Sequence, residues 1–409
     1  MSYPPDMSGA TISNLSTEGR RASGPAFFSF AFRPFFFCGA LYAGLAIPTW
    51  AAVFAGRLVI PAATFDPLRW HAHEMLFGYL GAVLAGFLLT AIPNWTGRLP
   101  VSGTRLAALL GLWLLGRIGA ALGAMGAIGP GLGMAMELLY WLALCAAAFR
   151  EVVAGKNKRN LPVVAMIAAF GLADLVSLLP DWTELDPMLG ARLAIATAAV
   201  LISLIGGRII PSFTRNWLAK ARGEPFPAPF GLIDKIAIAL TLVAMLAWAI
   251  WPDEIAAGAL LLAAGGVQAL RLARWQGQRT LSDPLVSILH LGYLWLVLAL
   301  LALGVSALAP EIVLPSAALH MMTAGAVGTM TLAVMTRASL GHTGRALVAD
   351  RGTRAIYLLA TLGAVLRIAV PWLPIDYGHA IAVAGMVWAS AFLLFAAKYG
   401  PTLFSQRAV

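Results

Sequence analysis

The chain has 409 residues, of which 60% are hydrophobic and 11% are charged, and its mean hydropathy is +0.83. Soluble domains carry about 25% charged residues, so this composition excludes a soluble globular protein and indicates a polytopic membrane protein. The formal net charge of +10 does not indicate a nucleic-acid partner, because membrane proteins concentrate Lys and Arg in their cytoplasmic loops.

The first 25 residues are polar and include Arg20 and Arg21. They lack the short apolar run and small-residue cleavage site of a signal peptide, so we expect residues 1–25 to form a cytoplasmic N-terminal tail. Residues 26–409 are predicted to form one polytopic transmembrane domain. A spanning helix needs about 20 apolar residues. An all-α integral membrane protein of about twelve transmembrane helices is predicted, with candidate spans at 30–54, 70–92, 104–123, 131–149, 161–180, 189–210, 232–251, 255–274, 284–308, 315–337, 354–373 and 378–398.

The loops between these runs differ in charge. Loops on one side carry most of the Lys and Arg, for example Lys156, Lys158 and Arg345, whereas those on the other side carry acidic residues such as Glu184 and Asp253. By the positive-inside rule, both termini should be cytoplasmic and the acidic loops should lie outside. We therefore expect a multi-pass protein of the bacterial inner (plasma) membrane, with its acidic loops in the periplasm.

An internal repeat relates the second and tenth runs. His73, Gly78, Gly81 and the Thr-Gly-Arg triplet at 96–98 recur in register as His320, Gly325, Gly328 and the triplet at 343–345. A fainter third copy in the sixth run appears when Thr214 is aligned with Thr96. Because these runs are four apart, three four-helix repeat units are predicted at about 26–150, 160–275 and 283–400. Repeats in membrane proteins often place a site at their interface.

Ionisable side chains gather at one depth, in the outer half of the predicted bundle. Charged groups at membrane depth are costly and by default mark a functional site. A purely structural interpretation is also open, in which Arg117 and Arg367 pair with Glu137 and Asp174 and hold helices together. His290 and His342 are placed toward the cytoplasmic side instead. The outer group comprises His71, His73, Glu74, Arg117, Glu137, Asp174, His320, Arg367 and His379, the last a capping or interfacial histidine.

The stretch from 66 to 74 predicts how the second helix begins. Asp66 and Pro67 are expected to be its N-cap and first residue. Residues two apart in an α-helix diverge by about 200°. His71 should therefore share a face with Glu74, and His73 should lie on the opposite face with Phe77, which makes chelation of one metal ion by both histidines difficult.

Several long motifs resemble the NnrS family: WHAHEMLFG at 70–78, PNWTGR at 93–98, GGRIIP at 206–211, HLGY at 290–293, GTMTLAVMTR at 328–337 and GHTGR at 341–345. The matching blocks run from about residue 28 to 346. The family is described as haem- and copper-containing membrane proteins linked to nitric oxide stress in denitrifying and related bacteria. The resemblance implies haem, copper, nitric oxide or a related small gas, the lipid bilayer and an unidentified electron donor as cofactors and partners.

The chain has no Cys-x-x-Cys-His motif, so the implied haem would be a non-covalent haem b. His73 and His320 are the leading ligand pair, either as two axial haem ligands or as one haem and one copper ligand, with His71 as the next candidate. Further assignments are copper donors at Met321 or Met322; haem propionate partners at Arg117, Arg367 and Arg69; orienting or proton-carrying carboxylates at Glu74, Glu137 and Asp174; and a second metal at His290, with His342.

Two rival functions remain alongside this reading. Internal repeats and buried charge also occur in a transporter or permease, although the sequence has no evident helix break at the midplane of its paired segments. A metal- or haem-handling assembly factor without its own catalysis would use the same histidines transiently. Whether the chain is a metallo-oxidoreductase that turns the gas over, senses it or protects other proteins from it stays open.

Overall fold

The computed structural model of the protein describes residues 24–60 and 66–407. Within these residues twelve helical spans are long and apolar enough to cross a membrane, which confirms the predicted all-α multi-pass fold. Most of the predicted N-terminal tail lies outside the described residues. Nine spans are single α-helices: α1 (Phe32–Phe54), α4 (Gly103–Ala124), α5 (Pro130–Ala154), α6 (Leu161–Leu178), α9 (Leu232–Ile250), α10 (Ile255–Ala273), α11 (Pro284–Leu308), α14 (Arg351–Ala369) and α15 (Tyr377–Phe404).

The second, sixth and tenth spans are composite. Each begins and ends as an α-helix and contains a π-helical stretch between, where hydrogen bonds run from i to i+5 and add a residue to the turn. The register that pairs His73 with His320 also pairs the π-helix of the second span with that of the tenth. These spans consist of α2 (Pro67–His73), η2 (Glu74–Leu80) and α3 (Gly81–Thr96); α7 (Leu189–Leu201), η5 (Ile202–Gly206) and α8 (Gly207–Lys220); and α12 (Pro315–His320), η7 (Met321–Val327) and α13 (Gly328–His342).

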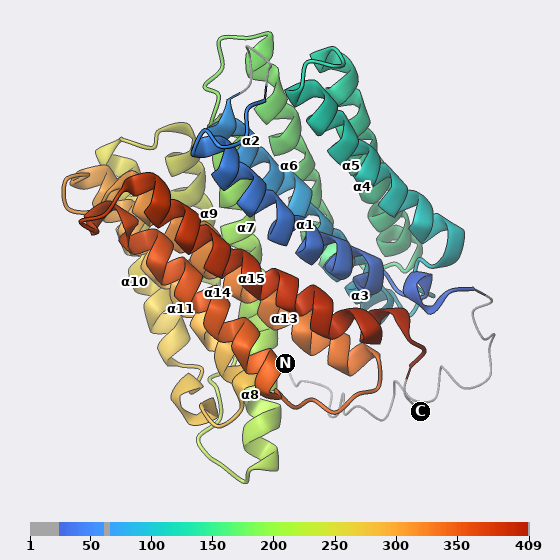
Figure 1. The fold of residues 1–409 in the computed structure, drawn as a ribbon. Coiled ribbons are helices and arrows are strands. Elements are labelled where there is room, and N and C mark those ends of the chain that lie inside the picture. Colours follow the sequence, from blue (N-terminus) through green and yellow to red (C-terminus); the bar gives the residue numbers. More distant parts are fainter. Residues whose placement is uncertain (1–23, 61–65, 408–409) are drawn as a thin grey trace.

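Neighbouring helices in space are often distant in sequence. Figure 1 shows α1, near the N-terminus, lying along α15, near the C-terminus, and the two helices are in extensive contact. Consecutive spans also pack on one another at the group boundaries, α5 on α6 and α10 on α11. The last span of each four-span group thus contacts the first span of the next group. We propose the three repeat units on the strength of this packing and the shared register of η2 and η7.

The composite spans form the interior of the bundle. In the second span 83% of the apolar window is buried, against 33% for the window of α5. A span that is shielded from lipid can carry polar side chains without exposing them to hydrocarbon. The interior position of the second and tenth spans therefore explains why most candidate residues fall on them and on their direct neighbours.

Candidate functional site

The start of the second span positions its two histidines. Oδ1 of Asp66 accepts hydrogen bonds from the backbone nitrogens of Leu68 at 2.8 Å and Arg69 at 3.3 Å, and Pro67 follows at the first helical position. This confirms the predicted N-cap and its proline. Because these bonds fix the start of α2, they also fix the positions of His71 and His73 along the helix.

His71 lines a cavity between helical spans of the bundle, which we call the histidine cavity. Its ring stacks on Trp50, with ring centroids 4.3 Å apart and an angle of 29° between the planes. The cavity is partly open and is lined mainly by apolar side chains from the first, second, sixth, tenth, eleventh and twelfth spans. His320, Thr323 and Arg367 contribute polar groups to the same cavity.

His320 is oriented by a hydrogen bond to its own helix. Its Nδ1 lies 2.7 Å from the carbonyl oxygen of Ser316, and a carbonyl only accepts, so Nδ1 carries the proton. Nε2 is then left as the nitrogen that can donate a lone pair. Metal-ligating histidines are commonly held in this manner, with the second ring nitrogen bonded to a backbone carbonyl.

Arg367 supplies the positive charge of the histidine cavity. One terminal nitrogen, NH2, donates to the side-chain oxygen of Ser316 at 2.8 Å, while the other, NH1, is buried without a hydrogen-bond partner. A buried guanidinium nitrogen without an acceptor costs free energy, so this position suits an anionic ligand group. The prediction that Arg367 pairs with Glu137 or Asp174 is wrong, because Arg367 bonds to Ser316 while those carboxylates bond to Arg117 and Trp141.

His73 belongs to a different assembly, the charge cluster of His73, Glu74, Arg117, Glu137 and Asp174. Nδ1 of His73 lies 2.9 Å from Oε1 of Glu74, and Nε2 lies 2.9 Å from Oδ1 of Asp174 and 3.1 Å from Oε2 of Glu137. Arg117 donates to Oε2 of Glu74 at 2.7 Å and to Oε2 of Glu137 at 3.0 Å. Four helical spans therefore meet at these five side chains.

Further side chains complete the hydrogen bonds of the charge cluster. Tyr42 donates to Glu74, and the indole nitrogen of Trp141 donates to Oδ2 of Asp174 at 2.6 Å. Both ring nitrogens of His73 face carboxylate oxygens, which only accept when they are ionised, so the arrangement suits a doubly protonated ring. The two cations, His73 and Arg117, then face the three carboxylates of the cluster. The side chain of His73 is only 14% exposed. Paired in this way, the charges can be buried at membrane depth.

The structure does not bring His73 and His320, the predicted leading pair, into one cavity. His71 and His320 line it together, and His73 points into the charge cluster. Phe77 lies near His73, with ring centroids 5.0 Å apart, whereas His71 and Glu74 both contact α1, through Trp50 and Tyr42 respectively. Glu74 also bonds to the adjacent His73.

The remaining predicted site residues are dispersed. Among the three arginines assigned to propionates, only Arg367 lines the histidine cavity, whereas Arg117 lies in the charge cluster and Arg69 donates to the carbonyl of Ser177. His290 bonds to Thr214 at 2.8 Å through Nε2, and its Nδ1 is buried without a partner. His342 is exposed and packs against Phe32 instead, so His290 and His342, predicted as a pair, contact different helices.

Sequence reasoning missed several cavity residues. The thioethers that line the cavity belong to Met75 and Met188, and neither Met321 nor Met322 lines it. Ser316 was also missed, although its position four residues before His320, on a predicted helix, was a usable signal. Trp50 gave no such signal, because its contact with His71 joins two different spans.

Among the described residues one group of histidine and carboxylate side chains has the spacing of a metal site. It consists of His73, Glu137 and Asp174, whose potential ligand atoms all lie within 4.8 Å of one another. The comparison with family models adds an independent finding, since a model described as NnrS protein matches residues 26–407. No curated protein matches the chain.

Proposed function

The chain belongs to the NnrS family, and from that premise we propose that it is a membrane haem protein that handles nitric oxide. The family is described as haem- and copper-containing, and it is linked to the nitric oxide response. Handling here means binding the gas and protecting other proteins from it. The observation that carries the proposal is the histidine cavity, where two imidazoles and a guanidinium with a free nitrogen share an otherwise apolar enclosure.

We assign the haem to the histidine cavity. Ligand sites are typically concave and mostly apolar, with a few polar groups that fix orientation, and the lining of the histidine cavity has this character. His320 would ligate the iron through Nε2, with the Ser316 carbonyl holding the ring in the required tautomer. Arg367 would bind a propionate through NH1, replacing the missing hydrogen-bond partner.

His71 is the second donor of the same cavity. Stacked on Trp50, its ring is held in place, and it would either help to hold the haem iron or offer a hydrogen bond to bound gas. When bound, haem supplies an iron that coordinates small diatomic gases, with the surrounding pocket deciding between binding and activation. The apolar wall contributed by residues such as Leu76, Ile195 and Leu319 keeps water away from that position.

Copper, the second implied metal, finds its donors in the charge cluster. His73, Glu137 and Asp174 offer one nitrogen and two carboxylates, and Cu(II) accepts mixed nitrogen and oxygen ligands. To ligate a metal, Nε2 of His73 must first release its proton, so metal binding here would be coupled to proton release. Arg117 would stay in place as the partner of Glu74 and offset part of the remaining negative charge.

Redox turnover of the gas is the second candidate function, and the charge cluster favours it. Its carboxylates lie 2.9–3.1 Å from the imidazole of His73 and provide buried proton acceptors for a route from the outer surface. Turnover also needs an electron donor. We further propose that both termini lie in the cytoplasm, with the acidic loops and the histidine cavity toward the periplasm, on the support of the loop charges.

Purified protein tests these assignments. We expect a Soret band and bound copper in the wild type, loss of the haem in His320→Ala, and loss of copper with an unchanged haem spectrum in His73→Ala. His379→Ala is the matched control, because this histidine is 70% exposed and pairs only with Asp376. Absence of both the Soret band and copper would overturn the proposal in favour of a permease or an assembly factor. Loss of haem in His290→Ala alone would move the site to the cytoplasmic half.

A further inference from the structure

A second cavity lies next to the histidine cavity, and we call it the apolar cavity. It is a partly open pocket between the three composite spans. Its lining includes Val83 and Phe87 from α3, Ala198 from α7, Ile209 from α8 and Val334 from α13. These spans are the ones whose apolar windows are most buried, apart from α11, so the cavity lies in the interior of the bundle.

The apolar cavity offers almost no polar group to a ligand. Thr331 is its only lining residue with a side-chain hydroxyl, and that oxygen bonds to the backbone carbonyl of Val327 at 2.8 Å and to the hydroxyl of Tyr79 at 2.5 Å. A buried water needs two to four polar partners, and cavities lined by Leu, Ile and Phe stay dry and take up xenon or small apolar molecules. The lining therefore selects a small uncharged occupant.

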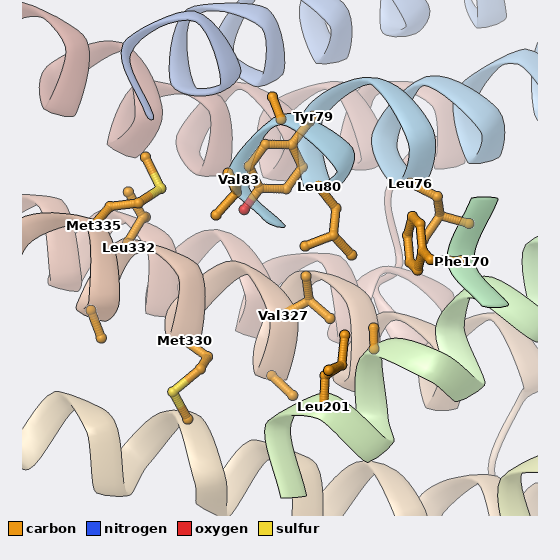
Figure 2. Packing of buried hydrophobic residues seen from close by; sticks show 14 of the residues in the cluster. Leu76, Tyr79, Leu80, Val83, Phe170, Leu201, Val327, Met330, Leu332 and Met335 are labelled. Atoms are coloured by element: carbon orange, nitrogen blue, oxygen red, sulfur yellow. The ribbon is translucent and has the colours of Figure 1, made fainter. Parts of the chain in front are cut away.

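Leu80 and Val327 line both cavities, so these two side chains form the partition between them. They occupy equivalent positions of the repeat, as the last residues of η2 and η7. Figure 2 shows both side chains pointing toward the space between their helices, with Leu201 of the sixth span below them. A partition of two aliphatic side chains can open by rotamer changes, which take place on the picosecond to nanosecond timescale in exposed residues and more slowly in packed ones.

The inner end of the apolar cavity is less shielded than the partition. Phe87, Ile209 and Val334 are half-buried, whereas Leu80 and Val327 are 3% and 5% exposed. The cavity therefore opens away from the histidines, toward the bilayer interior and the cytoplasmic half. Small apolar gases dissolve in hydrocarbon, so a gas within the membrane can reach this end without crossing a polar surface.

We propose that the apolar cavity is a binding site for a small uncharged gas, and that it delivers the gas to the histidine cavity past Leu80 and Val327. This inference rests on the proposed function for the identity of the gas as nitric oxide. The occupancy of the cavity by an apolar gas does not depend on haem, so it is tested separately. A lipid acyl chain is the competing occupant; its headgroup would need polar partners that the lining does not provide.

The first test uses crystals of the protein pressurised with xenon. Xenon is expected in the apolar cavity of the wild type and is expected to be lost in Ala198→Phe, since Ala198 lines this cavity and not the histidine cavity. Leu298→Phe serves as the control, because Leu298 lies on α11, is 40% exposed and lines neither cavity. An acyl chain in the cavity, or a cavity that excludes xenon, would overturn the inference.

The second test measures gas rebinding to the haem-loaded protein after flash photolysis. Ala198→Phe should slow rebinding about tenfold, a barrier about 1.4 kcal/mol higher, with the Soret band unchanged. Val327→Ala, which removes bulk from the partition, should speed rebinding and provides a readout if Ala198→Phe does not fold. Rates equal to wild type in both variants would overturn delivery. If no haem binds at all, the proposed function fails, and the xenon experiment still decides on the gas site.

Discussion

Nε2 of His73 lies 2.9 Å from Oδ1 of Asp174, and this contact joins the second span to the fifth. Asp174 is fully buried, and its other oxygen accepts the indole hydrogen bond of Trp141 from the fourth span. The charge cluster thus connects helices from two of the proposed repeat units. Its integrity should matter both for the stability of the bundle and for the direction in which the His73 ring points.

Removing Asp174 should therefore destabilise the protein strongly. In Asp174→Ala the His73 ring loses a buried partner, and breaking a buried pair costs about 3–5 kcal/mol of unfolding free energy. Denaturation in detergent, followed by circular dichroism, measures this loss. Asp186→Ala is the control, because Asp186 pairs with Arg192 at 51% exposure, and such surface pairs contribute about 0–1 kcal/mol. Equal losses in the two variants would contradict the role assigned to the buried contact.

The tight crossing of α6 and α7 leads to a second prediction. A Cβ added at Gly190, at the start of α7, would lie closer than 3.0 Å to the backbone of Ser177 at the end of α6. Gly190→Ala should thus cost about 1–3 kcal/mol, as overpacking does. Gly111→Ala should be neutral or stabilising by about 0.5–1 kcal/mol, because nothing lies within 4 Å of its added Cβ. Melting temperatures that rank the variants in the opposite order would show that α6 and α7 are spaced differently.

Acid stability should depend on Asp350, which caps α14 outside the membrane-spanning segments. The hydrogen bond from Lys398 lowers the pKa of the Asp350 carboxyl from 3.8 to about 2, and the backbone of Thr353 adds to this effect. A lowered pKa in the folded state stabilises the fold above the unfolded value of 3.8, and this contribution is lost as the pH falls toward 2. Melting curves between pH 5 and pH 2, values that span this window, should show the loss in the wild type.

Asp350→Asn is the matched variant for the acid experiment. Asn retains the ability to cap a helix, so the variant isolates the ionic contribution of the pair with Lys398. Its melting temperature should fall less than that of the wild type as the pH is lowered. Because Asp350 is 58% exposed, the difference should be small and should shrink with added salt. An identical acid response in both proteins would assign the acid sensitivity to other carboxylates.

Reporter fusions test the proposed orientation. Alkaline phosphatase becomes active only where its disulfides form, in the periplasm. A fusion in the acidic loop that contains Asp253 and Glu254, between α9 and α10, should be active, whereas a fusion at the C-terminus should be inactive. A C-terminal fluorescent protein should give the complementary signal. The reverse pattern would place the histidine cavity on the cytoplasmic side.

The amino-acid sequence by itself determined the number of spans, their order and the cap at Asp66 and Pro67. These features depend on local properties, since hydropathy within about 20 residues decides whether a segment spans the bilayer. Even there, the second, sixth and tenth spans extend beyond the apolar runs that predicted them, to Thr96, Lys220 and His342. A helix continues past the hydrocarbon as long as its backbone hydrogen bonds can be made.

Only the tertiary structure decided which histidine faces which partner. The helical period placed His71 and His73 on different faces, but it did not show that His71 would stack on Trp50 or that His73 would bond to Asp174. The contacts of His71 and His73 depend on side chains from other spans, namely Trp50 and Asp174, and no local pattern encodes such packing. The physical reason is that hydropathy describes the transfer of a single segment from water to lipid. Which side chain a residue of that segment contacts depends on the positions of all the neighbouring helices.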